Sequence, residues 1–276
     1  MSQYLADDLP DATGTKALRV WLESSGYARR LLLGREGDPW AEGAAKYLSF
    51  FTQARGLLRS DVAVVNVGDL FRSWMARHPG LVAEMASKTR ATYPLRRMLE
   101  EAGPRALLDE VVEAVGAHLQ GQTPLVLAMP APGAWLAEAQ ELVGRAPEVD
   151  ADTTEDAAMY IADFMRCVAQ RPVGGLLLEE GEAPGEVSAY TPLFNAARHY
   201  RWAVVGRGVA AGQDAPFDAV IGTDDKVQGR DVSAALFGGM DLPKTTSVQF
   251  LYAQVPVDHP PEAVLDAVAR LQGVSV

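Results

Sequence analysis

Two adjacent carboxylates, Glu179 and Glu180, directly follow the apolar run Gly175–Leu178 and are candidates for catalysis. A carboxyl group whose pKa is raised can transfer protons near neutral pH. Neighbouring residues of a strand point in opposite directions, so only one of the two can face a site. Arg207 follows a second apolar run, Ala203–Gly206. Its guanidinium could bind an anionic substrate group or form a structural ion pair with one of the two glutamates.

A second group of polar residues surrounds the end of the apolar run Val62–Val67. Asp69 is a candidate catalytic carboxylate, and Asn66 and Arg72 are candidate substrate-binding residues, since an arginine fork matches carboxylate geometry. Two other interpretations stay open. Asp69 could cap a helix expected to start near Phe71, and Arg72 could be a solvated residue of its first turn.

The secondary-structure elements that carry these side chains determine whether they can meet in one site. Most of the apolar runs lack alternation, as expected for strands covered on both faces, and longer segments with helical spacing separate them. This alternation of strand and helix predicts a parallel sheet. The expected strands are Val62–Val67, Leu125–Met129, Gly175–Leu178, Ala203–Gly206, Ala219–Gly222 and Ser247–Val255. The expected helices are Ala41–Leu58 with a break near Gly56, Ala106–Leu119, Thr154–Ala169 opening on its Thr, and Pro261–Leu271 ending before Gly273.

A parallel sheet of this kind is either open or closed into a barrel. No glycine-rich dinucleotide-binding turn follows the first run, so a barrel is favoured. The length of 276 residues suits one (β/α)8-type barrel spanning residues 1–276, for which about 250 residues are typical. Active sites of such barrels lie at the carboxyl ends of the strands, which is where the polar residues described above fall. The segments Gly181–Gly185 and Gly212–Pro216 are expected to be surface loops.

Composition limits the partners and the compartment. A formal net charge of -11 disfavours a nucleic-acid or anionic-membrane surface, which needs a concentrated basic field. The single cysteine, Cys167, excludes an internal disulfide and zinc sites built from several thiolates. Residues 1–14 lack the features of a signal peptide, and no apolar stretch is long enough to span a membrane, so we expect a cytoplasmic protein.

Metal and cofactor chemistry finds little support in the sequence. The four histidines show no metal-ligand spacing, and Cys167 lies within an expected helix, where a buried structural thiol is the common role. We therefore expect no metal site and no cofactor. Trp135, just after the loop Pro130–Gly133, could line a pocket.

Several short stretches resemble motifs of the uroporphyrinogen decarboxylase superfamily. The segment Ser60–Phe71 is similar to the family's strand that ends on an aspartate, and Asp69 matches that aspartate. The segments Pro124–Leu136 and Leu236–Pro243 resemble a Pro-Leu-Ile strand with its loop and an L-Q-G-N-L-D-P turn. The resemblance implies a distorted (β/α) barrel, shared with corrinoid-linked methyltransferases and cobalamin-independent methionine synthase, in which Asp69 holds N–H donors or stabilises a developing cation.

The chain departs from the family pattern in two places. The segment Val20–Arg30 shares the family's Val-Trp pair, but Ser24 stands where the family has a carboxylate-binding arginine, which leaves Arg29 as a displaced candidate for substrate binding. The final strand is followed by no family-type histidine, since His259 lies further along, in the loop before the last helix.

Three functions follow as hypotheses. The first is cofactor-free, decarboxylase-like lyase chemistry on a small carboxylated or cyclic molecule, with Asp69 at its centre. The second is methyl transfer with a corrinoid protein as partner, and the third is small-molecule binding without catalysis. A homodimer is plausible from the resemblance.

Overall fold

The structure is a computed structural model that describes residue 5 and residues 19–181, 185–209, 216–224, 227–242 and 248–274. Its centre is a single sheet of parallel strands, hydrogen-bonded in the order β1-β8-β7-β6-β5-β4-β3-β2. The strands are β1 (Arg19–Glu23), β2 (Ala63–Asn66), β3 (Leu125–Pro130), β4 (Gly175–Glu179), β5 (Ala203–Arg207), β6 (Ala219–Gly222), β7 (Gly229–Asp231) and β8 (Phe250–Gln254).

The two ends of the sheet, β1 and β2, are joined through the residues that precede β2. The amide of Val20 donates to the Asp61 carboxylate at 2.9 Å, and the Asp61 amide donates back to the Val20 carbonyl at 3.0 Å. The Leu22 amide donates to Ser60 Oγ at 3.0 Å. These contacts bring the ends together and complete a nearly closed barrel, so the expected distorted (β/α)8 fold is confirmed.

Side-chain alternation along the strands divides the core into an inner and an outer layer. The inner layer fills the barrel with apolar side chains that include Trp21, Leu177, Val205 and Phe250. Leu5 closes the amino-terminal end of the barrel, because its side chain is buried in this inner layer and its amide donates to the Gly174 carbonyl at 3.1 Å. The opposite end, where the strands finish, is therefore the one that can present a site.

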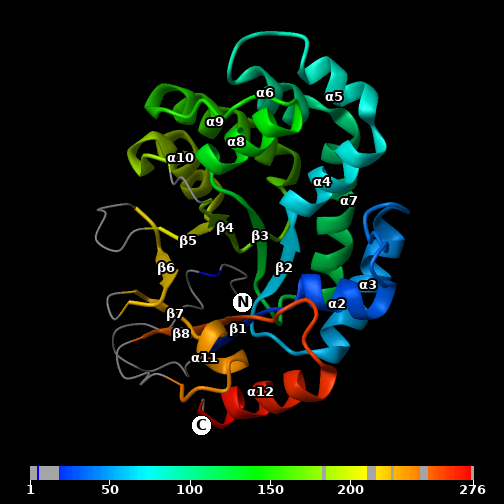
Figure 1. The fold of residues 1–276 in the computed structure, drawn as a ribbon, viewed down its shortest axis with the longest axis vertical. Coiled ribbons are helices and arrows are strands. Elements are labelled where there is room, and N and C mark those ends of the chain that lie inside the picture. Colours follow the sequence, from blue (N-terminus) through cyan, green and yellow to red (C-terminus); the bar gives the residue numbers. More distant parts are fainter. Residues whose placement is uncertain are drawn as a thin grey trace.

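The outer layer packs the strands against helices. Figure 1 shows α4, α5, α6, α8, α9 and α10 gathered above the barrel, α2, α3 and α7 beside β2, and α12 below β1 and β8. The helices are α2 (Ser25–Leu33), α3 (Ala44–Leu57), α4 (Val67–Arg77), α5 (Pro79–Met85), α6 (Tyr93–Glu100), α7 (Ala102–Leu119), α8 (Pro132–Leu142), α9 (Ala151–Phe164), α10 (Thr191–Tyr200), α11 (Ser233–Phe237) and α12 (Pro261–Val274), with 3-10 turns η1 (Met165–Val168) and η2 (Val187–Tyr190).

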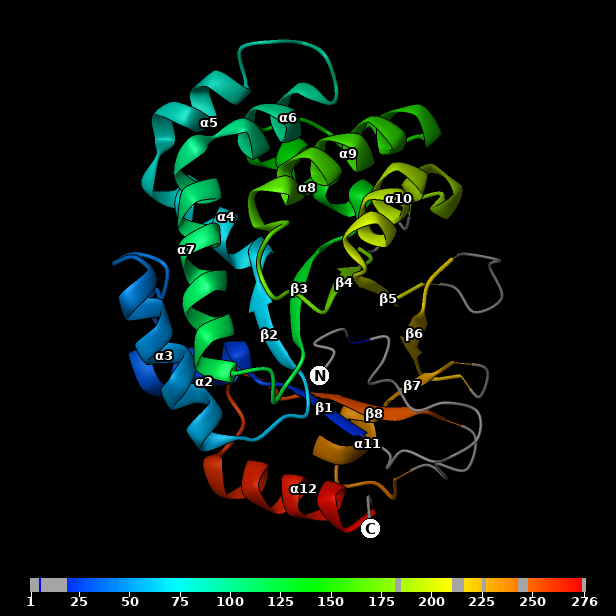
Figure 2. The same cartoon turned by 180° about the vertical axis from the view of Figure 1, so that it is seen from behind.

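The helical cover is uneven, which is the distortion of this barrel. Residues 208–209 and 216–218, between β5 and β6, contain no helix, nor do residues 223–224 and 227–228, between β6 and β7. Figure 2 shows the same arrangement from behind, with no labelled helix outside β6. None of the described helices is both long and apolar enough to cross a membrane.

The sequence predictions were correct for six strands and wrong in several details. Two strands were missed, β1 and β7. The expected break near Gly56 is absent, because α3 continues to Leu57. The last helix does not end before Gly273 but runs to Val274.

Two predicted helix starts were also wrong. The helix expected near Phe71 begins at Val67, and Asn66 caps it by accepting from the Asp69 amide at 2.8 Å, so Asp69 is not the cap. The helix expected to open on Thr154 begins after Asp150, whose side chain forms a capping box with Thr153. The expected loops Gly181–Gly185 and Gly212–Pro216 lie partly outside the described residues.

Candidate functional site

Arg207 is the centre of a polar network inside the mouth of the barrel. Its Nη1 donates to Glu179 Oε1 at 3.0 Å, and its Nη2 donates to Gln254 Oε1 at 2.8 Å and lies 3.5 Å from Asp231 Oδ2. These side chains come from the last residues of β5, β4, β8 and β7. Only 25% of the Arg207 side chain is exposed, so its ion pairs with Glu179 and Asp231 are partly desolvated. Charge interactions are stronger in such a place than in water.

Tyr252 and Trp21 lie below this network, on strands that pair directly with each other. The Arg207 guanidinium lies 4.9 Å from the centre of the Tyr252 ring, a cation–π distance. Burial raises the pKa of the Tyr252 hydroxyl well above its usual range. Both Tyr252 Oη and Trp21 Nε1 are fully buried and have no hydrogen-bond partner among the described residues. The network therefore rests on a packed aromatic floor.

Glu23, the last residue of β1, adds a further carboxylate to the mouth. Its Oε1 accepts from the Ser25 amide at 2.8 Å. Burial raises the pKa of Glu23 above the usual glutamate value, and the Glu179 and Asp69 carboxylates raise it further, while the hydrogen bond from Ser25 acts in the opposite direction. A raised carboxyl pKa is the property that a general acid needs near neutral pH.

The first turn of α4 forms the neighbouring part of the rim. Asp69 Oδ1 accepts from Arg72 Nη2 at 2.9 Å, and Arg72 Nη1 donates to Glu138 Oε2 on α8 at 3.4 Å. The Arg72 side chain is 55% exposed, so it is a charged group that a ligand can reach. Asn66 uses its side chain to cap α4, which makes it a positioning residue for Asp69.

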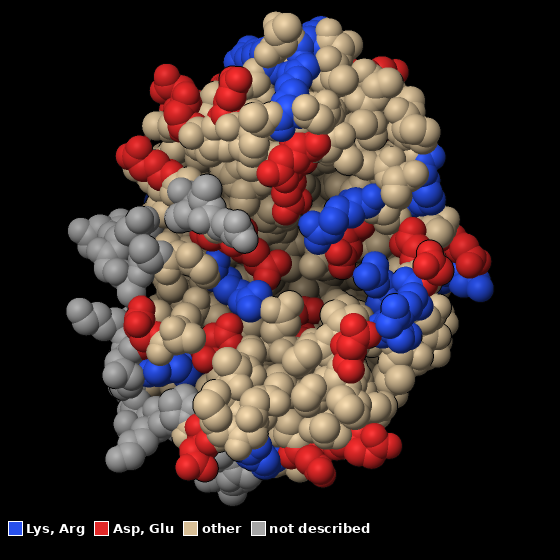
Figure 3. Space-filling model, viewed as in Figure 1, with Lys and Arg blue, Asp and Glu red and all other residues tan. Residues whose placement is uncertain are grey.

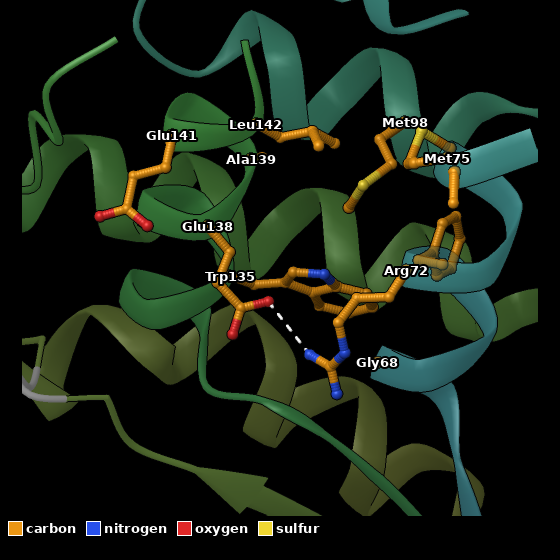
Figure 4. A pocket seen from close by; sticks show the side chains of 11 residues that line it. Gly68, Arg72, Met75, Met98, Trp135, Glu138, Ala139, Glu141 and Leu142 are labelled. Atoms are coloured by element: carbon orange, nitrogen blue, oxygen red, sulfur yellow. Dashed lines mark hydrogen bonds and ion pairs between the residues drawn. The ribbon is translucent and has the colours of Figure 1, made fainter. Parts of the chain in front are cut away.

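A cavity of about 500 Å³ opens beside Arg72, between α4, α6 and α8. Its volume is in the range of small-molecule sites. Figure 4 shows the Arg72–Glu138 contact at its mouth and the indole of Trp135 on its floor. Trp135 therefore lines a pocket, as its position suggested. Apolar side chains dominate the remaining wall, which includes Phe71, Met75, Met98, Ala139 and Leu142.

Glu138 connects the cavity to the network in the mouth. Burial raises its pKa, Arg72 lowers it, and the carboxylates of Glu141 and Glu179 raise it. The Glu179 carboxylate acts on the pKa of Glu138, so the mouth of the cavity lies within the electrostatic field of the barrel mouth. Figure 3 shows charged side chains of both signs around a hollow in the middle of this face.

Two candidate residues lie away from the mouth. Glu180 points outward, as strand alternation requires once Glu179 faces inward, and its Oε1 accepts from the Tyr190 hydroxyl at 2.7 Å. Burial raises the pKa of Glu180, with the Tyr190 contact opposing the shift. Arg29 lies exposed on α2 and forms no ion pair with any residue that the structure describes. Neither residue joins the group around Arg207.

Sequence reasoning missed Glu23, Asp231, Gln254 and Glu138. Glu23 and Asp231 end the two strands that were not predicted. Gln254 ends a predicted strand and carries the same signal that pointed to Glu179, a polar residue closing an apolar run. Glu138 lies on a helix, and nothing in the sequence pairs it with Arg72 on another.

Cys167 belongs to the helical layer, not to the rim. It lies in η1 and packs against the outer core, and burial raises the pKa of its thiol to about 11. Such a thiol stays protonated and is a poor nucleophile or metal ligand at neutral pH. Over the described ranges of the chain, His, Cys, Asp and Glu side chains form no group of three or more with the geometry to hold a metal ion.

Fold and geometry define a (β/α)8 barrel with an acidic, arginine-containing mouth and an adjoining apolar cavity. No family model matches the sequence, and no curated protein matches it. Among solved structures, the chain is similar to 2,3-dimethylmalate lyase, described as a member of the PEP mutase/isocitrate lyase superfamily. The identity is 12% and the TM-score 0.32, over 98% of this chain and 82% of that one.

Proposed function

We propose that the chain is a small-molecule enzyme that performs cofactor-free lyase chemistry of the decarboxylase type at the mouth of its barrel. The observation that carries this proposal is the convergence of Glu23, Glu179, Arg207 and Asp231 from four different strands. A single structural ion pair needs two residues, whereas this arrangement joins two carboxylates to one guanidinium and places a third carboxylate with a raised pKa beside them. Titratable groups with perturbed pKa values cluster in this way at active sites.

We assign Glu23 as the general acid of this reaction. In a decarboxylation the bond between the substrate carbon and its carboxylate breaks, carbon dioxide leaves, and the electron pair stays on the carbon. That carbon then takes a proton from the Glu23 carboxyl group, and solvent returns the proton to Glu23. The charge of Arg207 stabilises the negative charge that develops in this step, because it acts in a partly desolvated site.

The resemblance to the uroporphyrinogen decarboxylase superfamily supports the same class of reaction through Asp69. Its carboxylate lies at the rim and holds Arg72 at 2.9 Å, beside the mouth of the cavity. We assign Asp69 to binding and charge stabilisation, and Arg72 to contact with an anionic group of the substrate. The methyltransferase alternative gains no support from Cys167, which lies in η1 and not at the rim.

The test measures carbon dioxide released from a panel of aromatic and cyclic carboxylic acids, including amino-substituted ones. We expect at least one acid to be turned over, and Glu23→Gln to lower the rate by about 100-fold or more, because general acids contribute roughly 10²–10⁴. Glu100→Gln is the matched control, since Glu100 pairs with Arg96 on α6, outside the mouth. Turnover of no panel member, or full activity of Glu23→Gln, would overturn the proposal.

A further inference from the structure

The cavity between α4, α6 and α8 has a polar atom on its floor that makes no hydrogen bond with a described residue. Trp135 is 2% exposed, and its ring packs edge-on against Phe71 and Phe164 with centroid distances of 5.5 and 6.3 Å. Its indole N–H makes no hydrogen bond with any described residue. Figure 4 shows the nitrogen on the side of the ring toward the cavity. An indole nitrogen is a donor only. The floor therefore offers one hydrogen bond to an acceptor atom.

The cavity wall selects a flat apolar group. Phe71, Met75 and Met98 are each at most 4% exposed, so their positions are held by the surrounding core. Aromatic rings and methionine side chains make favourable contacts with an aromatic ligand. A cavity of about 500 Å³ is large enough for one substituted ring with a short side chain.

The charges at the cavity mouth are unbalanced toward the negative side. Arg72 is the cation of the lining, against the carboxylates of Glu138 and Glu141, and its shorter contact, 2.9 Å, goes to Asp69 on the rim. Glu138 is left with the longer contact of 3.4 Å, and Glu141 forms no ion pair within the described part of the chain. Burial raises the pKa of Glu138 more than Arg72 lowers it, and the Glu141 carboxylate adds to the rise. An anionic head group would approach the carboxylates of Asp69, Glu138 and Glu141. A cationic head group would instead balance the negative charge of Glu138.

We propose that this cavity binds an aromatic compound that carries a cationic nitrogen on a short side chain and a hydrogen-bond acceptor on its ring. The ligand ring lies against Trp135, and the acceptor atom on that ring accepts from the indole N–H. The cationic head group contacts the Glu138 carboxylate. The inference rests on the proposed function, because it assigns the substrate class of the same site.

The experiment measures binding by titration calorimetry, without turnover, using three probes that share a 4-methoxyphenyl ring. They are 2-(4-methoxyphenyl)ethylammonium, 2-(4-methoxyphenyl)ethanol and 3-(4-methoxyphenyl)propionate. We expect the ammonium probe to bind about tenfold or more tightly than the propionate, with a preference that weakens as salt is added. An ammonium probe without the methoxy group is expected to bind the native chain more weakly than the methoxy probe does. The Trp135→Phe variant, which lacks the indole N–H, is expected to bind the two probes equally.

Two carboxylate variants test the head group. Glu138→Gln is expected to weaken the ammonium probe roughly five- to tenfold and to leave the alcohol unchanged, since an interaction with a half-exposed carboxylate is of that size. Glu100→Gln, a carboxylate on α6 outside the cavity lining, is expected to change neither. Circular dichroism and the melting temperature confirm that each variant folds.

Tighter binding of the propionate, unchanged ammonium binding in Glu138→Gln, or no binding of any probe at about 10 mM would each overturn the inference. The outcomes separate the two proposals. Binding without turnover of any acid contradicts the enzymatic function alone. Turnover that depends on Glu23, in a chain that binds none of the probes, contradicts the cavity assignment alone.

Discussion

Two fully buried tyrosines of this barrel should respond in opposite ways to loss of the hydroxyl group. Tyr252 faces the barrel interior, and its hydroxyl has no hydrogen-bond partner in the described part of the chain. Tyr190 lies in η2 and its hydroxyl donates to Glu180 at 2.7 Å. Both side chains are 0% exposed, so replacement by phenylalanine removes one oxygen atom from an equally buried place in each case.

Tyr252→Phe is expected to stabilise the protein. A buried polar group without a partner costs about 1–3 kcal/mol, and the phenylalanine ring keeps the packing against Trp21 and the contact with Arg207. Allowing for a slightly weaker cation–π contact, we expect a gain of about 1 kcal/mol in the free energy of unfolding. For a chain of this length that corresponds to a rise of about 2 °C in the melting temperature.

Tyr190→Phe is the matched comparison and is expected to destabilise. It removes a hydrogen bond to a carboxylate, an interaction worth about 1.5–3 kcal/mol. Glu180 Oε2 has no partner among the residues that the structure describes, so the variant leaves the buried carboxylate still less compensated. Urea unfolding of the native chain and both variants at pH 7 measures the two changes. Equal destabilisation by both substitutions would refute the reasoning, because it would mean that the Tyr252 hydroxyl is as well hydrogen-bonded as that of Tyr190.

Two further predictions concern the pH dependence of stability. Hydrogen bonds from Arg171 at 2.6 and 2.7 Å lower the pKa of Asp109. The stability that this ion pair contributes is therefore present above a pH of about 4 and is lost as the pH falls through the lowered pKa. Asp109→Asn should make the stability less dependent on pH in this range, measured by acid unfolding followed by circular dichroism. The pKa of Glu23 is raised, so the free energy of unfolding falls as the pH rises from about 4.3 through the pKa of the folded protein. Glu23→Gln should remove that fall. An unchanged dependence of the unfolding free energy on pH in this variant would contradict the prediction.

The sequence predicts the strands that are apolar and misses those that are not. β4 and β5 are apolar up to their last residues, so Glu179 and Arg207 could be found as polar residues at strand ends. β7 is Gly-Arg-Asp, three residues without an apolar side chain, and it forms a strand because β6 and β8 pair with it on either side. Asp231 could not be located from the sequence for that reason.

The missed strand β1 shows a different limit. Its apolar part is only the three residues Val20, Trp21 and Leu22, with charged residues at both ends. Trp21 and Leu22 are buried because β8 and the residues before β2 hydrogen-bond to β1, contacts between parts of the chain far apart in sequence. Glu23 enters the mouth through this pairing. Similarly, which of Glu179 and Glu180 faces inward depends on the register of β4 with its neighbours, whereas alternation alone predicts only that one of them does.

The charge balance of the mouth joins the two proposals into one description of the substrate. The carboxylates of Asp69, Glu138, Glu179 and Asp231 outnumber the guanidinium groups of Arg72 and Arg207. Both arginines already contact carboxylates, so a substrate with a carboxylate as its only charged group would meet net repulsion on entering. A substrate that also carries a cationic nitrogen avoids this repulsion, because Glu138 takes the cation while Arg72 takes the carboxylate. We therefore expect amino-substituted aromatic acids to be turned over in preference to aromatic acids that lack the cation, and equal turnover of the two would contradict this account.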